Sequence, residues 1–267
     1  MNRPSSLFAT RSFLFGIAAL LCVMAGPAPA QEAETETAPA ADPNQRYAAC
    51  MTMARSDPAA AEGEAIAWVA ENGAAAAQHC HAISLIGLGR YQEAAEILER
   101  LARELPPDQA RTVADLFGQA AQAWMLSGGY DRAIADLDQS IVLAPYDVEF
   151  VIDRAVAKAS GGLYWEAIDD LNNASEMAPA RSDILILRAS AYRFVEANEL
   201  AMEDIVRVLE VEPQNAEAIF ERGMLHAIAG SIEEARADWQ QVVQLVPGSA
   251  TAEAAQANLE ATAPVPE

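Results

Sequence analysis

The spacing of four prolines constrains the fold more than any other feature of this sequence. Pro145, Pro179, Pro213 and Pro247 follow one another at intervals of 34 residues. A fixed period of this size indicates a repeat architecture, in which each repeat is one small unit that buries its apolar face against its neighbours. Because proline cannot continue a helix, each of the four is expected to end one.

Other positions repeat with the same period when the chain is aligned on these prolines. Two columns hold small residues, a third holds larger apolar residues and a fourth holds aspartate. The columns are Ala121, Ala155, Ala189 and Gly223; Ala133, Ala167, Ala201 and Ala235; Leu137, Leu171, Ile205 and Trp239; and Asp136, Asp170, Asp204 and Asp238. Chance does not produce agreement in several columns over four units, so the sequence contains a true internal repeat.

Residues 114–147 carry the repeat most completely. They show Phe117, Ala121 and Trp124, then Gly128, Gly129 and Tyr130, then Ala133, Leu137 and Pro145. In these positions the sequence resembles the tetratricopeptide repeat (TPR) family, whose unit of 34 residues is a helix, a turn and a second helix. The resemblance implies an all-α fold, a right-handed superhelical solenoid of helix–turn–helix repeats. It also implies a concave surface lined by the first helix of each unit.

The repeat extends over nearly the whole chain beyond its first 42 residues. A short insertion at about 109–113 lengthens one period to 39 residues, and the unit 182–215 replaces the turn glycine with Glu196-Ala197-Asn198, so its turn is expected to differ. The predicted elements are a divergent hairpin at 43–73, repeats at 75–108, 114–147, 148–181, 182–215 and 216–248, a capping helix at 249–262 and a frayed tail at 263–267.

The first thirty residues have the layout of a secretory signal peptide. Arg3 and Arg11 precede an apolar run from Phe13 to Ala25, and small residues up to Ala30 suit cleavage after it. The alternative is a membrane anchor, but the run is short of the roughly 20 residues that span a bilayer. We therefore expect no integral membrane span after cleavage, and an exported protein, periplasmic or secreted. The acidic composition of residues 31–42, which has few apolar side chains, predicts a disordered leader.

Charge excludes one class of partner. The chain has 17 Lys+Arg against 39 Asp+Glu, a formal net charge of −22. Nucleic acid requires a basic surface, so nucleic-acid binding is not expected. The signal layout and the preference for Arg over Lys favour a bacterial source. The expected partner is a protein or peptide segment that is apolar and possibly basic.

Two cysteines remain after removal of the signal, Cys50 and Cys80. In an exported protein an even number favours a disulfide, and stacked repeats would make the helices that carry them neighbours; two buried thiols are the alternative. His79 and His81 point about 200° apart on a helix, so no metal site is predicted. The sequence lacks nucleophile-elbow, phosphate-loop and zinc-protease motifs, so we expect no enzyme activity and no cofactor.

A column of arginines accompanies the column of aspartates. We expect partly buried ion pairs between helices, because the guanidinium fork can bind a carboxylate with two hydrogen bonds. Pairing within units would leave Asp136 without an arginine, and pairing between units would leave Asp238. The alternative is ordinary surface charge. The candidate residues are Arg154, Arg188, Arg222, Asp136, Asp170, Asp204 and Asp238.

The TPR resemblance also implies a partner groove. Its candidates are Met125, Leu126, Ile152, Val156, Ile186, Ser190, Arg193, Phe194, Phe220, Met224 and Ile228, some of which could instead be core between repeats. Acids at the starts of the same helices, Asp115, Glu149, Asp183 and Glu217, are either first-turn residues that complement the helix dipole or an acidic rim that selects basic partners.

The function predicted from the sequence is non-catalytic protein or peptide binding through the concave groove, as a scaffold or adaptor in a bacterial periplasm. The alternatives are an accessory or regulatory subunit of an envelope enzyme complex and an unrecognised hydrolase.

Overall fold

The computed structural model describes residues 42–263. The predicted signal peptide, almost all of the predicted leader and the last four residues of the tail lie outside this range. Within it, the chain forms thirteen α-helices, one short 3₁₀ segment and no strand. No helix among these residues has the length and apolar character needed to cross a membrane.

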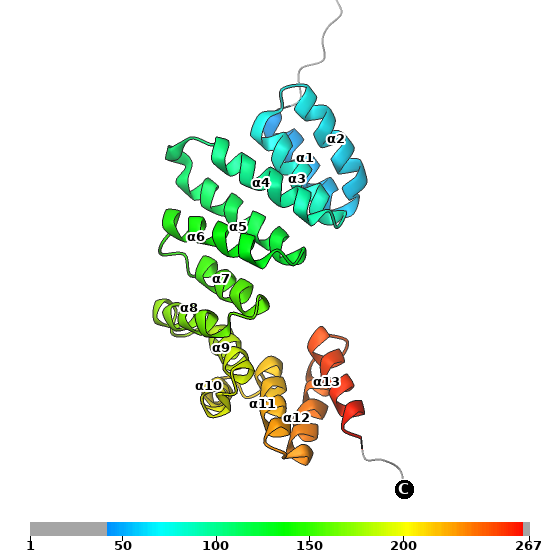
Figure 1. Ribbon diagram of the computed structural model, residues 1–267. Helices are drawn as coiled ribbons and strands as arrows, with labels where there is room; N and C mark the ends of the chain where they lie inside the picture. The colour runs from blue at the N-terminus through cyan, green and yellow to red at the C-terminus, as the bar shows by residue number, and fades with distance from the viewer. Residues whose placement is uncertain (1–41, 264–267) are drawn as a thin grey trace, which may run out of the picture. The chain divides into compact units, whose positions relative to one another are not determined.

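The helices form antiparallel pairs, and each helix packs against the next along the chain (Figure 1). The described part of the chain is thus an all-α helical repeat solenoid. The pairs are α1 (Pro43–Ser56) with α2 (Pro58–Ala70), α3 (Ala74–Gly87) with α4 (Tyr91–Glu104), α5 (Ala110–Leu126) with α6 (Tyr130–Leu143), α7 (Val148–Ser160) with α8 (Tyr164–Met177), α9 (Ser182–Phe194) with α10 (Asn198–Val211), and α11 (Ala216–Ile228) with α12 (Ile232–Leu245); α13 (Ala250–Ala261) follows alone.

The insertion near residues 109–113 is absorbed by a helix. A 3₁₀ segment, η1 (Pro107–Gln109), precedes α5, which has 17 residues, whereas α7 has 13. The extra residues therefore lengthen the first helix of this unit by about one turn and leave the helix pairing intact.

Local sequence defines the helix ends. The side chains of Asp147, Asn215 and Ser249 cap the first turns of α7, α11 and α13 by accepting backbone hydrogen bonds. At the other end, α6, α8, α10 and α12 each stop two residues before one of the four prolines. The 34-residue spacing is thus the spacing of helix ends.

The repeated columns form the core between paired helices. Ala133, Ala167, Ala201 and Ala235 are all fully buried. One column shows a compensating pair: a Cβ on Gly223 would lie 2.6 Å from the indole nitrogen of Trp239. Glycine at 223 therefore makes room for tryptophan at a position that holds leucine or isoleucine in the other units.

The turn of the unit 182–215 is expected from its sequence to differ from the other turns, but it has the same conformation. Glu196 takes φ 61°, the left-handed conformation that Gly128 (φ 79°) and Gly162 (φ 83°) take at equivalent positions. The next amide also makes the same bond, from Ala197 N to Tyr192 O at 2.9 Å. The glutamate therefore adopts the turn conformation that glycine adopts in the neighbouring units.

Replacing this glutamate tests the strain directly. A left-handed conformation costs a residue with a Cβ about 1 kcal/mol, so Glu196→Gly should raise the free energy of unfolding by that amount in urea titration. The matched change Ala197→Gly, at φ −82°, should lower it. Equal losses in both variants would contradict this account of the turn.

Candidate functional site

The predicted ion pairs form within units. The guanidinium groups of Arg154, Arg188 and Arg222 each bind the aspartate 16 residues later, in the second helix of the same pair. Each uses two hydrogen bonds, of 2.6–3.1 Å, to the two carboxylate oxygens. The aspartates are buried and the arginines partly so. The pairs are Arg154 with Asp170, Arg188 with Asp204, and Arg222 with Asp238.

Two of these arginines also reach the preceding unit. Nη1 of Arg154 binds Asp138 at 2.6 Å, and Nη1 of Arg188 binds Asn172 at 2.9 Å. Each of these guanidinium groups therefore ties three helices together: its own, its partner's and the second helix of the unit before.

Asp136 is the aspartate without an arginine, because Ala120 stands where the other units place one. It is only 4% exposed, and its Oδ2 has no hydrogen-bond partner. Its neighbour is the buried Glu99, on α4, which accepts hydrogen bonds from Trp124 Nε1 (2.7 Å) and Arg103 (2.8 Å). Arg132 also contacts Glu99, at 3.2 Å.

The two carboxyl groups have opposite pKa shifts. Burial raises the pKa of Asp136 to about 7, and the negative charge of Glu99 adds to the effect. Burial also acts against ionisation of Glu99, but hydrogen bonds from Arg103 and Trp124 outweigh it and lower the Glu99 pKa. Below about pH 7 the uncharged form of Asp136 is therefore favoured beside the Glu99 carboxylate, where the other units have an arginine–aspartate pair.

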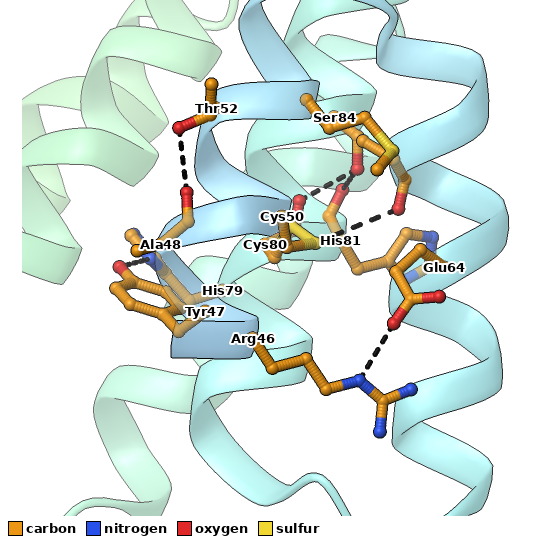
Figure 2. Close-up of a disulfide and its surroundings, with 12 residues drawn as sticks. Arg46, Tyr47, Ala48, Cys50, Thr52, Glu64, His79, Cys80, His81 and Ser84 are labelled. Atoms are coloured by element: carbon orange, nitrogen blue, oxygen red, sulfur yellow. Dashed lines mark hydrogen bonds and ion pairs between the residues drawn. A yellow bond between two sulfur atoms is a disulfide. The ribbon is translucent and has the colours of Figure 1, made fainter. Parts of the chain in front are cut away.

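The cysteine pair joins the first and second helix pairs. Cys50 on α1 and Cys80 on α3 form a disulfide with a Cα–Cα distance of 6.1 Å, and both residues are buried. Figure 2 shows the bond between these helices, with Arg46 and Glu64 forming an ion pair beside it (2.8 Å).

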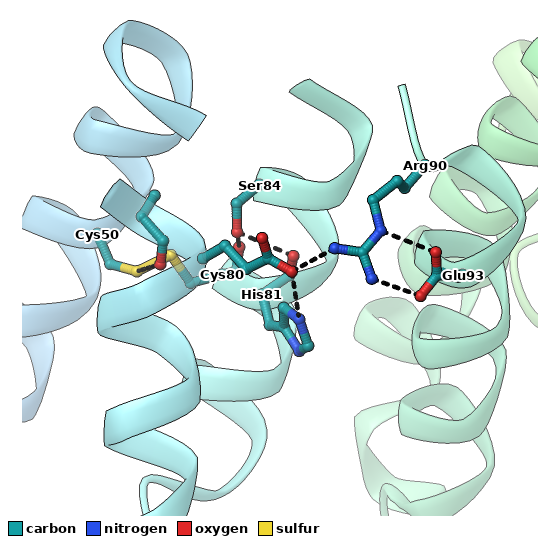
Figure 3. Close-up of polar contacts among 8 residues, drawn as sticks. Cys50, Cys80, His81, Ser84, Arg90 and Glu93 are labelled. Atoms are coloured by element: carbon teal, nitrogen blue, oxygen red, sulfur yellow. Dashed lines mark hydrogen bonds and ion pairs between the residues drawn. A yellow bond between two sulfur atoms is a disulfide. The ribbon is translucent and has the colours of Figure 1, made fainter. Parts of the chain in front are cut away.

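His79 and His81, two residues apart on α3, point in different directions, as the helix geometry predicts. His81 lies 3.7 Å from Glu62, on the side of α3 where Arg90 binds Glu93 at 2.6 Å (Figure 3). His79 faces the first helices of the adjacent units. The structure brings no three metal-binding side chains together in residues 42–263.

His79 belongs to a row of polar side chains that the sequence pattern did not reveal. Its Nδ1 is hydrogen-bonded to the hydroxyl of Tyr47 and its Nε2 to Oε1 of Gln119, both at 2.7 Å. The row crosses α1, α3 and α5, the first helices of three successive units. These residues line a cavity of about 330 Å³ whose walls include Leu101 and Leu105. A groove of this kind can hold an apolar side chain beside polar groups.

The predicted groove residues lie in several environments. Ile152 and Ile186 are buried in the core between helices, so they are not free to contact a partner. Met224 accepts a contact from Asn258 of the capping helix. Met125, Val156, Ser190 and Phe220 are half-buried. The exposed residues are Leu126, Phe194 and Ile228.

Arg193, another predicted groove residue, forms an ion pair. Its Nε binds Glu221 at 2.8 Å, and both side chains are largely buried. The pair links α9 to α11, the first helices of adjacent units. The two opposite charges therefore neutralise each other between these helices, and Arg193 is not free to bind a partner.

The predicted acidic rim is largely neutralised within the molecule. Arg111 binds both Asp115 (3.0 Å) and Asp147 (2.7 Å), and Arg181 binds both Glu149 and Asp183. Among the described residues, Glu217 is the rim acid that has no ion pair. Neither arginine belongs to a repeated column, so the periodic pattern did not indicate them.

A substitution at Asp136 tests the raised pKa of this carboxyl group. Between about pH 4 and 7 the folded protein holds one proton more at this site than the unfolded chain, so the free energy of unfolding falls as pH rises through this window. Asp136→Asn is neutral at every pH. It should match the wild type near pH 4 and exceed it by about 4 kcal/mol at pH 8, in urea titrations. The control Asp170→Asn weakens a charged pair and should lower the free energy of unfolding at pH 8. An equal loss in Asp136→Asn would contradict the raised pKa of Asp136.

No protein-family model matches this sequence, and no curated protein does. Solved structures do match. MamA from Desulfovibrio magneticus RS-1 superposes with a TM-score of 0.54 at 20% identity, over 64% of this chain and 94% of that one. TTC0263, a thermophilic TPR protein from Thermus thermophilus, gives 0.55 at 17% identity, over 71% and 98%.

A third similar structure is YrrB, described as a TPR protein with an unusual peptide-binding site. It has a TM-score of 0.50 at 14% identity, over 72% of this chain and 96% of its own. Identities this low establish the fold alone. Together with the 34-residue helix pairs, they show that this chain has the all-α solenoid fold of tetratricopeptide repeat proteins.

Proposed function

We propose that this protein is a non-catalytic scaffold, exported to a bacterial periplasm, whose concave groove binds a protein or peptide segment. The observation that carries the proposal is the row Tyr47–His79–Gln119 beside an apolar-walled cavity of about 330 Å³. Extended peptides are held in such grooves by a few polar contacts together with pockets for apolar side chains.

The fold supports this proposal. The first helices of the first three hairpins form this surface before any partner arrives, because the Cys50–Cys80 disulfide joins α1 to α3 and the hydrogen bonds of His79 join α3 to α1 and α5. A preformed surface loses little conformational entropy on binding. The similar structure YrrB is itself described as having a peptide-binding site.

Export is supported by two features of the chain. The first thirty residues have the layout of a signal peptide. The pair Cys50–Cys80 has disulfide geometry, and disulfides persist in oxidising compartments such as the bacterial periplasm.

A pair of matched variants tests the groove. His79→Ala removes the centre of the polar row, whereas His81→Ala makes the same change on the same helix outside the groove. A partner that co-purifies in fixed stoichiometry with the mature chain from the envelope fraction should bind His79→Ala at least tenfold more weakly and His81→Ala as tightly as wild type. Equal affinities for both variants, at equal thermal stability, would exclude the groove as the binding site.

The mass of the protein isolated from cells tests export. We expect a mature chain that begins after Ala30 and has no free thiol under native conditions. Reduction should add two hydrogens and lower the free energy of unfolding by about 3 kcal/mol, the entropy of closing a loop of thirty residues. A full-length chain with both cysteines open to alkylation would contradict the proposal.

A further inference from the structure

Exposed apolar side chains gather at one edge of the solenoid. In the four units from α5 to α12, the first helix ends and the second begins at this edge, which we call the turn edge. Neighbouring turns touch along it: the rings of Tyr164 and Phe194 stack with centroids 4.7 Å apart, and Gly161 packs against Tyr130. The exposed apolar residues, 38–58% accessible, are Leu126, Leu163, Trp165, Phe194, Ile228 and Ile232.

Acidic side chains run beside this apolar row. They stand in the first turns of the second helices α6, α8, α10 and α12, where they complement the helix dipole, and all are exposed. None of them forms an ion pair within residues 42–263, in contrast to the neutralised acids at the opposite edge. They are Asp131, Glu166, Glu199, Glu233 and Glu234.

The basic residues near the turn edge bind other partners. Arg132 contacts Glu99, Lys158 binds Asp170 at 2.7 Å, and Arg193 binds Glu221. In the preceding unit, the acid of the first turn, Glu93, is paired with Arg90 (Figure 3). In the units from 114–147 to 216–248, the acids in the first turn of the second helix therefore have no ion pair.

We propose that the turn edge of these four units binds a basic amphipathic helix of another protein. The apolar face of that helix covers the row that includes Leu126, Trp165 and Phe194, and its lysines or arginines face the acids of the second helices. An amphipathic helix has an apolar stripe flanked by charge, which is the complement of this edge. The proposal rests on the proposed function as a protein-binding scaffold, but it names a surface distinct from the groove.

Charge argues against other occupants. A second copy of a chain with a net charge of −22 would bring like charges together at this edge. An anionic lipid surface attracts basic segments and repels acidic ones. A basic partner gains both from burial of apolar surface and from long-range attraction to the acids.

Trp165 provides a local probe. It is 58% exposed, whereas Trp68, Trp124 and Trp239 are at most 6% exposed, so the quenching of tryptophan fluorescence by acrylamide reports mainly on this edge. The ligand is an 18-residue peptide of leucine and lysine with its leucines on one helical face. A peptide of the same composition in scrambled order is the control. Binding should shift the emission to shorter wavelength and at least halve the quenching, and the scrambled peptide should bind at least tenfold more weakly.

Variants locate the bound peptide. Leu126→Ser with Ile228→Ser, and separately Glu166→Gln with Glu199→Gln, should each weaken binding at least tenfold. The controls are Val142→Ser with Val211→Ser, which are 76% and 79% exposed away from this edge, and Glu176→Gln with Glu210→Gln. Both control pairs should bind as wild type does.

Several results would overturn this assignment. They are no binding of the peptide, equal losses in edge and control variants, or protection of Trp165 by self-association or by anionic vesicles in place of the peptide. Loss of peptide binding in His79→Ala alone would also overturn it, since the peptide would then occupy the groove, and the proposed function would stand. If the natural partner binds both His79→Ala and the edge variants as tightly as it binds the wild type, the proposed function is contradicted as well.

Discussion

Burial of one aspartate carboxylate in each of the four helix pairs from α5 to α12 is the constraint on which this structure depends. A charged group in that position must be paired, because leaving it alone in the core costs several kcal/mol. Arg154, Arg188 and Arg222 meet this requirement with forked hydrogen bonds. A fork that must reach both oxygens fixes how one helix is rotated against the other. Where Ala120 replaces the arginine, burial raises the pKa of Asp136 to about 7, which favours the uncharged form below that pH and reduces the cost of burying it.

The internal ion pairs also determine what the surface offers to a partner. Most basic side chains bind acids of the same chain, including Arg111 and Arg181 at the rim and Arg193 in the groove. The groove that remains is polar at Tyr47, His79 and Gln119 and nearly neutral along its rim. The turn edge differs from this groove, because exposed acids without an ion pair stand there beside exposed apolar residues.

The repeat was readable because it is periodic. Prolines and alanines at fixed intervals predicted the all-α solenoid. The arginine column predicted ion pairs with the aspartate column but left open whether they form within or between units. Contacts between residues that do not belong to a repeated column could not be predicted from the sequence. His79 finds Tyr47 and Gln119 across a divergent hairpin and an insertion, and no column aligns these three residues. Burial of Ile152 and Ile186 follows from the packing of neighbouring helices, which a single helix pattern does not fix. The left-handed Glu196 shows tertiary packing overriding a local preference.

A double-mutant cycle on Arg188 and Asp204 tests the central claim most directly. If the pair orders the helices, Arg188→Met alone should lower the free energy of unfolding by about 3 kcal/mol, because it leaves a buried carboxylate unpaired. Adding Asp204→Leu should recover most of that loss, giving a coupling energy of about 2 kcal/mol in urea titrations. An unchanged urea midpoint in Arg188→Met, or losses that simply add, would show that these residues are ordinary surface charges and would contradict the account.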